Sequence, residues 1–140
     1  MIKKIIILLA FIITVLSVCY YLEFEDYYRI GEKDYFNIKV GQELQIKLYE
    51  NGSTGYTNCW LNEKNNTMLI KVKEEYSQGL YARLKYDGAG GINKISFKGI
   101  KVGVDTIKIA HCSSFDGKKY EEYNEKNTES DYEFIVNITR

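Results

Sequence analysis

The sequence predicts an all-β domain, an antiparallel β-sandwich of seven to eight strands, and three observations lead to this prediction. Apolar residues alternate with polar ones in short runs, as at Leu44, Ile46 and Leu48, which is the pattern of a strand with one buried face. Turns that contain glycine separate these runs. No segment of residues 35–140 has the period of an amphipathic helix. Two sheets packed face to face would bury the apolar side of every such strand.

The chain begins with a segment of a different kind, residues 1–22, which read MIKKIIILLAFIITVLSVCYYL. Two lysines precede an apolar run that is short for a membrane span and typical of a signal or anchor segment. Residues 16–19 resemble the lipobox of bacterial lipoproteins, in which the cysteine, here Cys19, receives lipid. Val18, however, stands where a lipobox has Gly, Ala or Ser. A lipoprotein, a secreted protein and an anchored protein all remain open, and each implies export.

The remaining strands follow a polar spacer, residues 23–34, and belong to a domain of residues 35–140. With 140 residues and a hydrophobic share of 45%, the chain can build one core. The alternation predicts that the following residues face this core: Met68, Ile70, Val72, Leu80, Ala82, Leu84, Ile95, Phe97, Ile107, Ile109, His111, Tyr132, Phe134, Val136 and Ile138.

Three segments interrupt the alternation: residues 51–59, 87–91 and 112–130. In a seven-stranded immunoglobulin-like order, they would join the second strand to the third, the fourth to the fifth, and the sixth to the seventh. All three would then emerge at one end of the sandwich. Loops held at a common end of a rigid scaffold are where such a fold carries its binding groups.

Two of these segments contain motifs. The first reads Asn51-Gly52-Ser53-Thr54-Gly55-Tyr56, and the second reads Gly88-Ala89-Gly90-Gly91. They resemble the Asn-Pro-Thr-Thr-Gly-Tyr/Phe and Gly-x-Gly-Gly motifs of the chagasin family, exported inhibitors of papain-like cysteine proteases. The stretch IKIAHCSSF, residues 107–115, is similar to the strand that runs into the family's third motif, Arg-Pro-Trp. The likeness spans about residues 36–140 and implies the same immunoglobulin-like sandwich.

The resemblance also implies how such a protein acts, namely by reversible occupation of the protease cleft without a covalent step. The first loop would enter the cleft with Thr54 and Gly55 near the catalytic cysteine, and Gly90 and Gly91 would pair along the cleft wall as an added strand. Two departures from the motifs weaken this expectation: Gly52 replaces a proline, and Ser113-Ser114-Phe115 stands in place of Arg-Pro-Trp. We therefore expect weaker inhibition, or a different target protease.

Other classes of function find little support in the residues. With 19 basic and 19 acidic side chains, the chain has no net field to attract nucleic acid. His111 and Cys112 are adjacent on a strand and so point to opposite faces, which excludes a nucleophile and base pair. A single histidine also argues against a zinc site of the usual kind. We predict a monomer that is not an enzyme, has no cofactor or metal, and meets the membrane only through its N-terminal segment. The alternative is an adhesion or envelope interaction module without inhibitory activity.

The last prediction is a disulfide between Cys59 and Cys112. The third and sixth strands are antiparallel neighbours in this order, so the start of the third strand faces the end of the sixth. If Trp60 and His111 point inward, both cysteines point outward on the same solvent face. Export to an oxidising compartment would favour the bond, which would contribute about 3 to 4 kcal/mol on the chain-entropy model. The alternative is two reduced, partly buried thiols. Independently of the cysteines, we expect His111 to point inward and to be a hydrogen-bonded structural residue.

Overall fold

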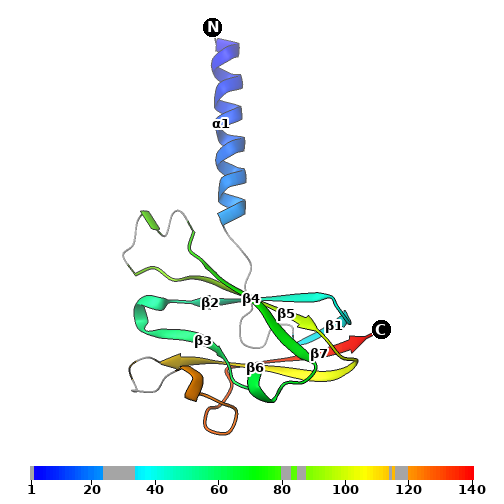
Figure 1. The fold of residues 1–140 in the computed structure, drawn as a ribbon. Helices are drawn as coiled ribbons and strands as arrows, with labels where there is room; N and C mark the ends of the chain where they lie inside the picture. The colour runs from blue at the N-terminus through cyan, green and yellow to red at the C-terminus, as the bar shows by residue number, and fades with distance from the viewer. Residues whose placement is uncertain (1, 24–33, 80–82, 85–87, 114, 116–119) are drawn as a thin grey trace.

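The computed structural model describes residues 2–23, 34–79, 83–84, 88–113, 115 and 120–140 (Figure 1). These residues form an N-terminal helix, α1, followed by seven strands and three one-turn 3-10 helices. The bounds of the strands are β1 (Tyr35–Lys39), β2 (Glu43–Glu50), β3 (Tyr56–Trp60), β4 (Leu69–Ser77), β5 (Gly91–Gly99), β6 (Gly103–Ser113) and β7 (Tyr132–Thr139). The bounds of the helices are α1 (Ile2–Glu23), η1 (Gly52–Thr54), η2 (Glu63–Asn65) and η3 (Tyr120–Glu122).

The strands form two sheets, one in the order β1-β7-β6-β3 and one in the order β2-β5-β4. All the hydrogen-bonded strand pairs of the described residues are antiparallel except β1 with β7, which are parallel. The predicted β-sandwich is therefore confirmed, with one parallel pair that the alternation did not indicate. The third and sixth strands are neighbours as predicted, with Trp60 opposite Ile109.

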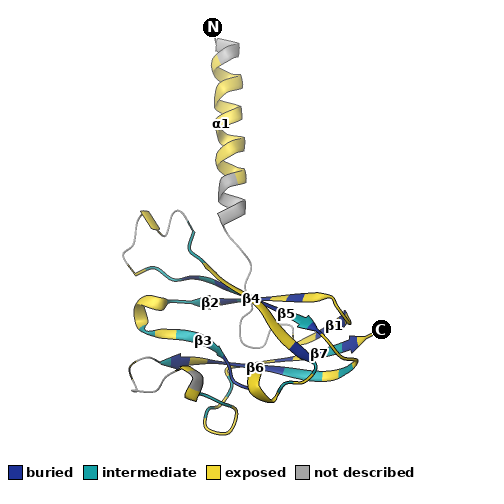
Figure 2. Ribbon diagram, viewed as in Figure 1, coloured by how far each residue is buried: buried dark blue, intermediate teal, exposed yellow. Residues whose placement is uncertain are grey.

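The core lies between the two sheets. Its fully buried side chains come from β2, β4, β5, β6 and β7, and Figure 2 shows buried residues alternating with accessible ones along the strands. The indole ring of Trp60 meets the ring of Phe97 edge to face, with the ring centres 5.0 Å apart. The buried apolar residues of this core are Phe36, Ile38, Leu44, Ile46, Leu48, Trp60, Leu69, Ile95, Phe97, Ile107, Ile109, Phe134, Val136 and Ile138.

The predicted alternation is wrong for β4. Leu69 is buried there, whereas Ile70 and Val72 are 43% and 46% exposed, and Met68 lies before the strand and packs partly against the core. Two causes account for the difference. β4 is an edge strand of its sheet, and its register with β5 shifts between Lys71 and Lys73. A bulge of this kind changes which residues face inward from Val72 onward, whereas Ile70 precedes it and is exposed on the uncovered face of the edge strand.

A strand predicted around residues 80–84 is also wrong where the structure describes it. Arg83 and Leu84 are helical, the Arg83 N–H donates to the Gly79 carbonyl at 3.1 Å, and Leu84 is 79% exposed. Leu80 and Ala82 lie outside the described residues. The third strand, in contrast, begins at Tyr56, earlier than the interruption at residues 51–59 suggested.

Helix α1 contains the predicted leader segment, and its large apolar side chains between Ile5 and Val18 are exposed (Figure 2). Within the part of the chain that the structure describes, no helix has the length and apolar character needed to cross a membrane. The side chain of Cys19 is not described, and most of the predicted spacer, residues 24–33, lies outside the described residues. Cleavage, lipidation and anchoring of this segment stay predictions.

Candidate functional site

Three connections meet at one end of the sandwich, the left end in Figure 1: β2 to β3, β4 to β5, and β6 to β7. Two contacts join them. The Ser53 hydroxyl of the first connection donates to the Gly88 carbonyl of the second at 2.9 Å. The ring of Phe115, in the third, covers Gly55 so closely that a Cβ atom at residue 55 would collide with it. The three predicted loops therefore form one surface.

The first loop is a capped 3-10 turn. The Asn51 side-chain oxygen accepts a hydrogen bond from the Ser53 N–H at 3.2 Å and lies 2.7 Å from the Ser53 hydroxyl, whose single proton is shared between this oxygen and the Gly88 carbonyl. The Thr54 hydroxyl donates to the Asn51 carbonyl at 2.6 Å. Gly55 ends the turn with φ of 71°, in the left-handed region that glycine adopts without strain. These bonds fix the shape of the loop without the proline that Gly52 replaces.

The second motif is held by two tyrosines. A Cβ atom on Gly90 would collide with the ring of Tyr49, and one on Gly91 would collide with the Ser77 carbonyl and the ring of Tyr76. Gly91 is also the first residue of β5 and lies opposite Glu50 in the sheet. These two glycines therefore serve the packing of the protein itself.

The third loop begins at the end of β6. The Tyr123 hydroxyl donates to the Ser113 carbonyl at 2.8 Å and accepts from the Ser113 N–H at 3.2 Å. The Ser113 hydroxyl oxygen accepts from the Phe115 N–H at 3.0 Å, and the Phe115 side chain is 76% exposed. Ser114 lies outside the described residues. The aromatic residue of the third motif is thus placed beside the first loop.

A disulfide joins Cys59 to Cys112, whose Cα atoms lie 5.9 Å apart. Both cysteines lie on the outer face of the four-stranded sheet, but the prediction that this face meets solvent is wrong. Cys112 is fully buried in a small apolar cluster with Leu61 and Ala110, and Tyr123 packs against it. The connection between β6 and β7 supplies this cover.

His111 is also placed differently from its prediction. It is hydrogen-bonded, since its backbone N–H donates to the Asp131 carboxylate at 2.7 Å and its Nδ1 lies 3.1 Å from the same oxygen. It is not buried, because its side chain is 37% exposed. The reason is its position at the end of β6, beyond the last core residue, Ile109.

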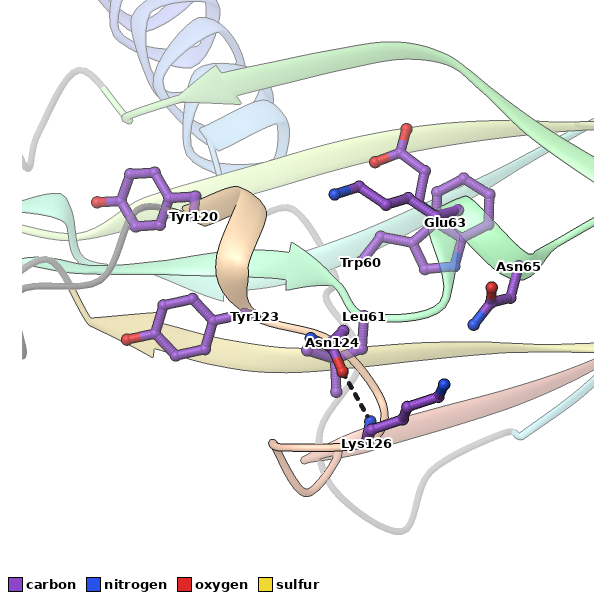
Figure 3. Close-up of a pocket in the computed structure, with 9 residues that line it drawn as sticks. Trp60, Leu61, Glu63, Asn65, Tyr120, Tyr123, Asn124 and Lys126 are labelled. Atoms are coloured by element: carbon purple, nitrogen blue, oxygen red, sulfur yellow. Dashed lines mark hydrogen bonds between the residues drawn. The ribbon is translucent and has the colours of Figure 1, made fainter.

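A hollow of about 320 Å³ lies beside the third loop (Figure 3). Tyr120 and Tyr123, on and just after η3, line one side of it, and Trp60 and Leu61 line its floor. The Lys126 N–H donates to the Asn124 side-chain oxygen at its rim. Among the described residues, no group of three or more His, Cys, Asp or Glu side chains could hold a metal ion. Nothing in this hollow indicates a cofactor.

Sequence reasoning missed a polar group at the base of the loops, in which the buried Asn58 and Asn93 donate to the half-buried Glu50. A signal for it was present in the alternation. Asn58 is two residues before Trp60, and Asn93 is two residues before Ile95, so both asparagines occupy inward-facing positions of their strands. Polar residues at such positions need partners inside the protein.

The fold and these loops define a β-sandwich binding protein with a composite loop surface at one end. A family model described as Chagasin family peptidase inhibitor I42 matches residues 37–133, so the chain belongs to this family of peptidase inhibitors. The members of this family are peptidase inhibitors, which are not enzymes.

Solved structures agree with the fold. The solution structure of amebosin is 20% identical, covers 75% of this chain and 88% of its own, and gives a TM-score of 0.51. The cysteine protease inhibitor EhICP2 from Entamoeba histolytica is 19% identical, with 77% and 87% of the two chains covered and a TM-score of 0.50. A search of curated proteins finds no match.

Proposed function

We propose that this protein inhibits papain-like cysteine proteases by laying its three loops across the active-site cleft, reversibly and without a covalent step. The observation that carries the proposal is the joined surface itself, in which the capped turn of residues 51–55 lies between Gly88 and Phe115. A preformed surface loses less conformational freedom on binding than separate flexible loops would lose.

The tip of the first loop suits a narrow cleft. Gly52, Ser53 and Thr54 are exposed and small, and a Cβ atom on Gly52 would have nothing within 4 Å. The hydroxyls of Ser53 and Thr54 are turned back into bonds with Asn51 and Gly88. The tip therefore offers mainly backbone to a partner and no activated nucleophile, which favours blocking by occupation.

Titration of papain with the folded domain tests this proposal, and Thr54→Arg is the informative variant. A long charged side chain at the tip should prevent entry into the cleft. Burying an unpaired charge at an interface core costs several kcal/mol, so we expect the inhibition constant to rise by about 100-fold or more. Thr67→Arg is the matched control, since Thr67 is also exposed but precedes β4 at the other end of the sandwich. Equal inhibition by Thr54→Arg and Thr67→Arg would remove the first loop from the mechanism.

The glycines of the second motif give a less clean test. A Gly91→Val substitution would crowd the cleft wall, but the new side chain would also meet Ser77 and Tyr76 of the protein itself. A loss of inhibition in that variant would therefore report a disturbed β5 as much as a lost contact. Full papain activity at micromolar wild-type protein would favour the adhesion or envelope module instead.

We also propose that the protein is exported and that residues 1–22 direct this step. The support is the order of two lysines, an apolar run and a lipobox-like end in the sequence. The N-terminal mass of the protein recovered from the cell exterior would distinguish cleavage, lipidation at Cys19 and an uncleaved anchor. Retention of the full-length chain inside the cell would contradict export.

A further inference from the structure

We propose that Glu50 is the positioning residue of the inhibitory surface, because its carboxylate closes the base of the first loop and fastens that loop to the strand of the second motif. The inference rests on the proposed function, since it assigns a new role within the same site. The alternation of β2 gave Glu50 no role, as it is merely the last residue of that strand.

One oxygen of Glu50 accepts three hydrogen bonds. The backbone N–H of Asn58 donates at 2.8 Å and its side-chain amide at 3.1 Å, and the side-chain amide of Asn93 donates at 2.9 Å. Glu50 precedes the first loop and Asn58 follows it, so the first two bonds hold the two ends of the loop together. Asn93 comes two residues after Gly91, so the third bond fastens this base to the second motif.

These bonds also connect the two sheets. Glu50 and Asn93 belong to the three-stranded sheet, and Asn58 belongs to β3 at the edge of the four-stranded sheet. Asn58 and Asn93 are only 5% and 2% exposed. Glu50 is half-buried, and hydrogen bonds to a charged acceptor are stronger than neutral ones, so this group should define the relative position of the sheets at the loop end.

Each of the two amides donates to Glu50 and to one further acceptor, Asn58 to the Tyr49 carbonyl at 3.2 Å and Asn93 to the Glu74 carboxylate at 3.0 Å. Among the described residues, the side-chain oxygens of Asn58 and Asn93 are buried without a hydrogen-bond partner. An unpaired buried acceptor is unfavourable. Turning either amide over would place its oxygen against the carboxylate, and both amides instead direct their N–H groups to Glu50. The Glu50 carboxylate, which only accepts, is the acceptor that both amides share, and it favours this arrangement together with the Tyr49 carbonyl and the Glu74 carboxylate.

Further charged and ionisable groups lie near Glu50 and Asn93. The Asn93 amide also donates to the Glu74 carboxylate at 3.0 Å, and Lys71 pairs with Glu74 at 3.0 Å. The side chain of Tyr76 is close enough to Glu50 for its ionisation to respond to the Glu50 charge. The Asn93 amide therefore lies between two carboxylates. Lys71 balances the negative charge of Glu74, and the N–H donors of Asn58 and Asn93 stabilise the negative charge of Glu50.

Glu50→Gln tests the proposal, because it removes the charge while nearly keeping the shape. We expect the inhibition constant for papain to rise about tenfold, mainly through slower association, because fewer molecules then hold the loops in the binding arrangement. Glu43→Gln is the matched control: the same change, at an exposed residue at the other end of β2. It should change the constant less than about twofold.

A second readout separates positioning from general stability. In hydrogen exchange, the Asn58 backbone amide of the wild type should be protected although β3 is an edge strand, and Glu50→Gln should lose about tenfold of this protection. Amides of the β6–β7 ladder should keep theirs. A merely structural role for Glu50 would lower protection throughout the sandwich and leave the association rate of folded molecules unchanged.

The outcomes are distinguishable. An unprotected Asn58 amide in the wild type, or equal inhibition by Glu50→Gln and Glu43→Gln, overturns the role of Glu50. This wild-type measurement decides the matter even if Glu50→Gln does not fold. If the wild type fails to inhibit papain while Asn58 is protected, the proposed function fails and the inhibitory part of the inference fails with it, whereas the link between the loops stands.

Discussion

The two ends of the sandwich are held by different kinds of bonds. At the end away from the loops, the links between separate connections are made by backbone groups, whereas the Asn66 side chain bonds within its own connection, to Met68 and Leu69. The Gly41 N–H donates to the Gly99 carbonyl at 2.8 Å, and the Ile100 N–H to the Met68 carbonyl at 2.8 Å. Such bonds depend little on which side chains are present, and apolar core residues such as Ile138 pack beneath them.

The loop end depends on side chains. A serine hydroxyl, an aromatic ring, a carboxylate and a disulfide join its segments through Ser53, Phe115, Glu50 and Cys59. A single substitution can therefore change this surface while the backbone pairing of the far end preserves the fold. The comparison teaches that stability and inhibition should be separable in this protein, and the predictions below test that separation.

The largest expected effect is on stability, from Phe97→Ala. Phe97 is fully buried near the end of β5 that lies away from the loops, against Trp60. Truncation of such a ring costs about 3 to 5 kcal/mol through lost burial and a remaining cavity. Chemical denaturation measures the loss, and active-site titration of papain measures the inhibition constant of the molecules that stay folded. That constant should be unchanged; a parallel loss of affinity would show that the two ends are coupled through the core.

The second predicted effect is on both stability and inhibition, because the disulfide lies at the base of the loop end. Replacing both Cys59 and Cys112 with alanine should cost about 3 to 4 kcal/mol of unfolding free energy on the chain-entropy model for 53 residues of separation. It should also weaken papain inhibition, since it frees β3, which follows the first loop, from the end of β6, which precedes the third loop. Leu61→Ala is the control, because it disturbs the same apolar cluster and leaves the bond intact. Unchanged inhibition by the double variant would show that the hydrogen bonds alone hold the loops.

The far end and the core were largely predictable from the sequence, and the reason is burial. Ile46, Phe97, Ile107 and Val136 lie on strands with one face in the core, so the period of two translates directly into structure. The alternation did not predict burial in β4, because an edge strand with a bulge has little of either face covered.

The loop end was predictable in outline but not in its bonds. Motif order placed residues 51–56 and Gly88–Gly91 at a common end, since the strand order fixes where each connection emerges. The contact of Phe115 with Gly55 and the cover that Tyr123 gives to the cysteines both depend on the path of a long connection. The periodicity of the sequence does not predict the path of a long loop, so these contacts could be found only from the three-dimensional structure.

The smallest expected effect is the alkaline titration of Tyr76, which lies at the loop end between the second motif and Glu50. Burial raises the pKa of Tyr76 above its ordinary value, and the charges of Glu50 and Tyr49 raise it further. The folded state thus keeps the proton at a pH at which the unfolded chain has already lost it. Stability is unaffected below the unfolded pKa of about 10 and falls as the pH rises from there through the folded pKa.

A comparison of the wild type with Tyr76→Phe measures this effect. Denaturation at about pH 8 and about pH 11 should show that the wild type loses more stability than the variant, because only the wild type has a hydroxyl at residue 76 that must lose its proton. The loss should be small, since the side chain of Tyr76 is half exposed and water screens the charge of Glu50. Glu50→Gln should lower the pKa of Tyr76 only in part, because burial is the larger cause. A Tyr76 titration that is identical in the wild type and in Glu50→Gln would mean that the Glu50 carboxylate does not lie beside the second motif, and the two ends of the sandwich would then differ less than their bonds indicate.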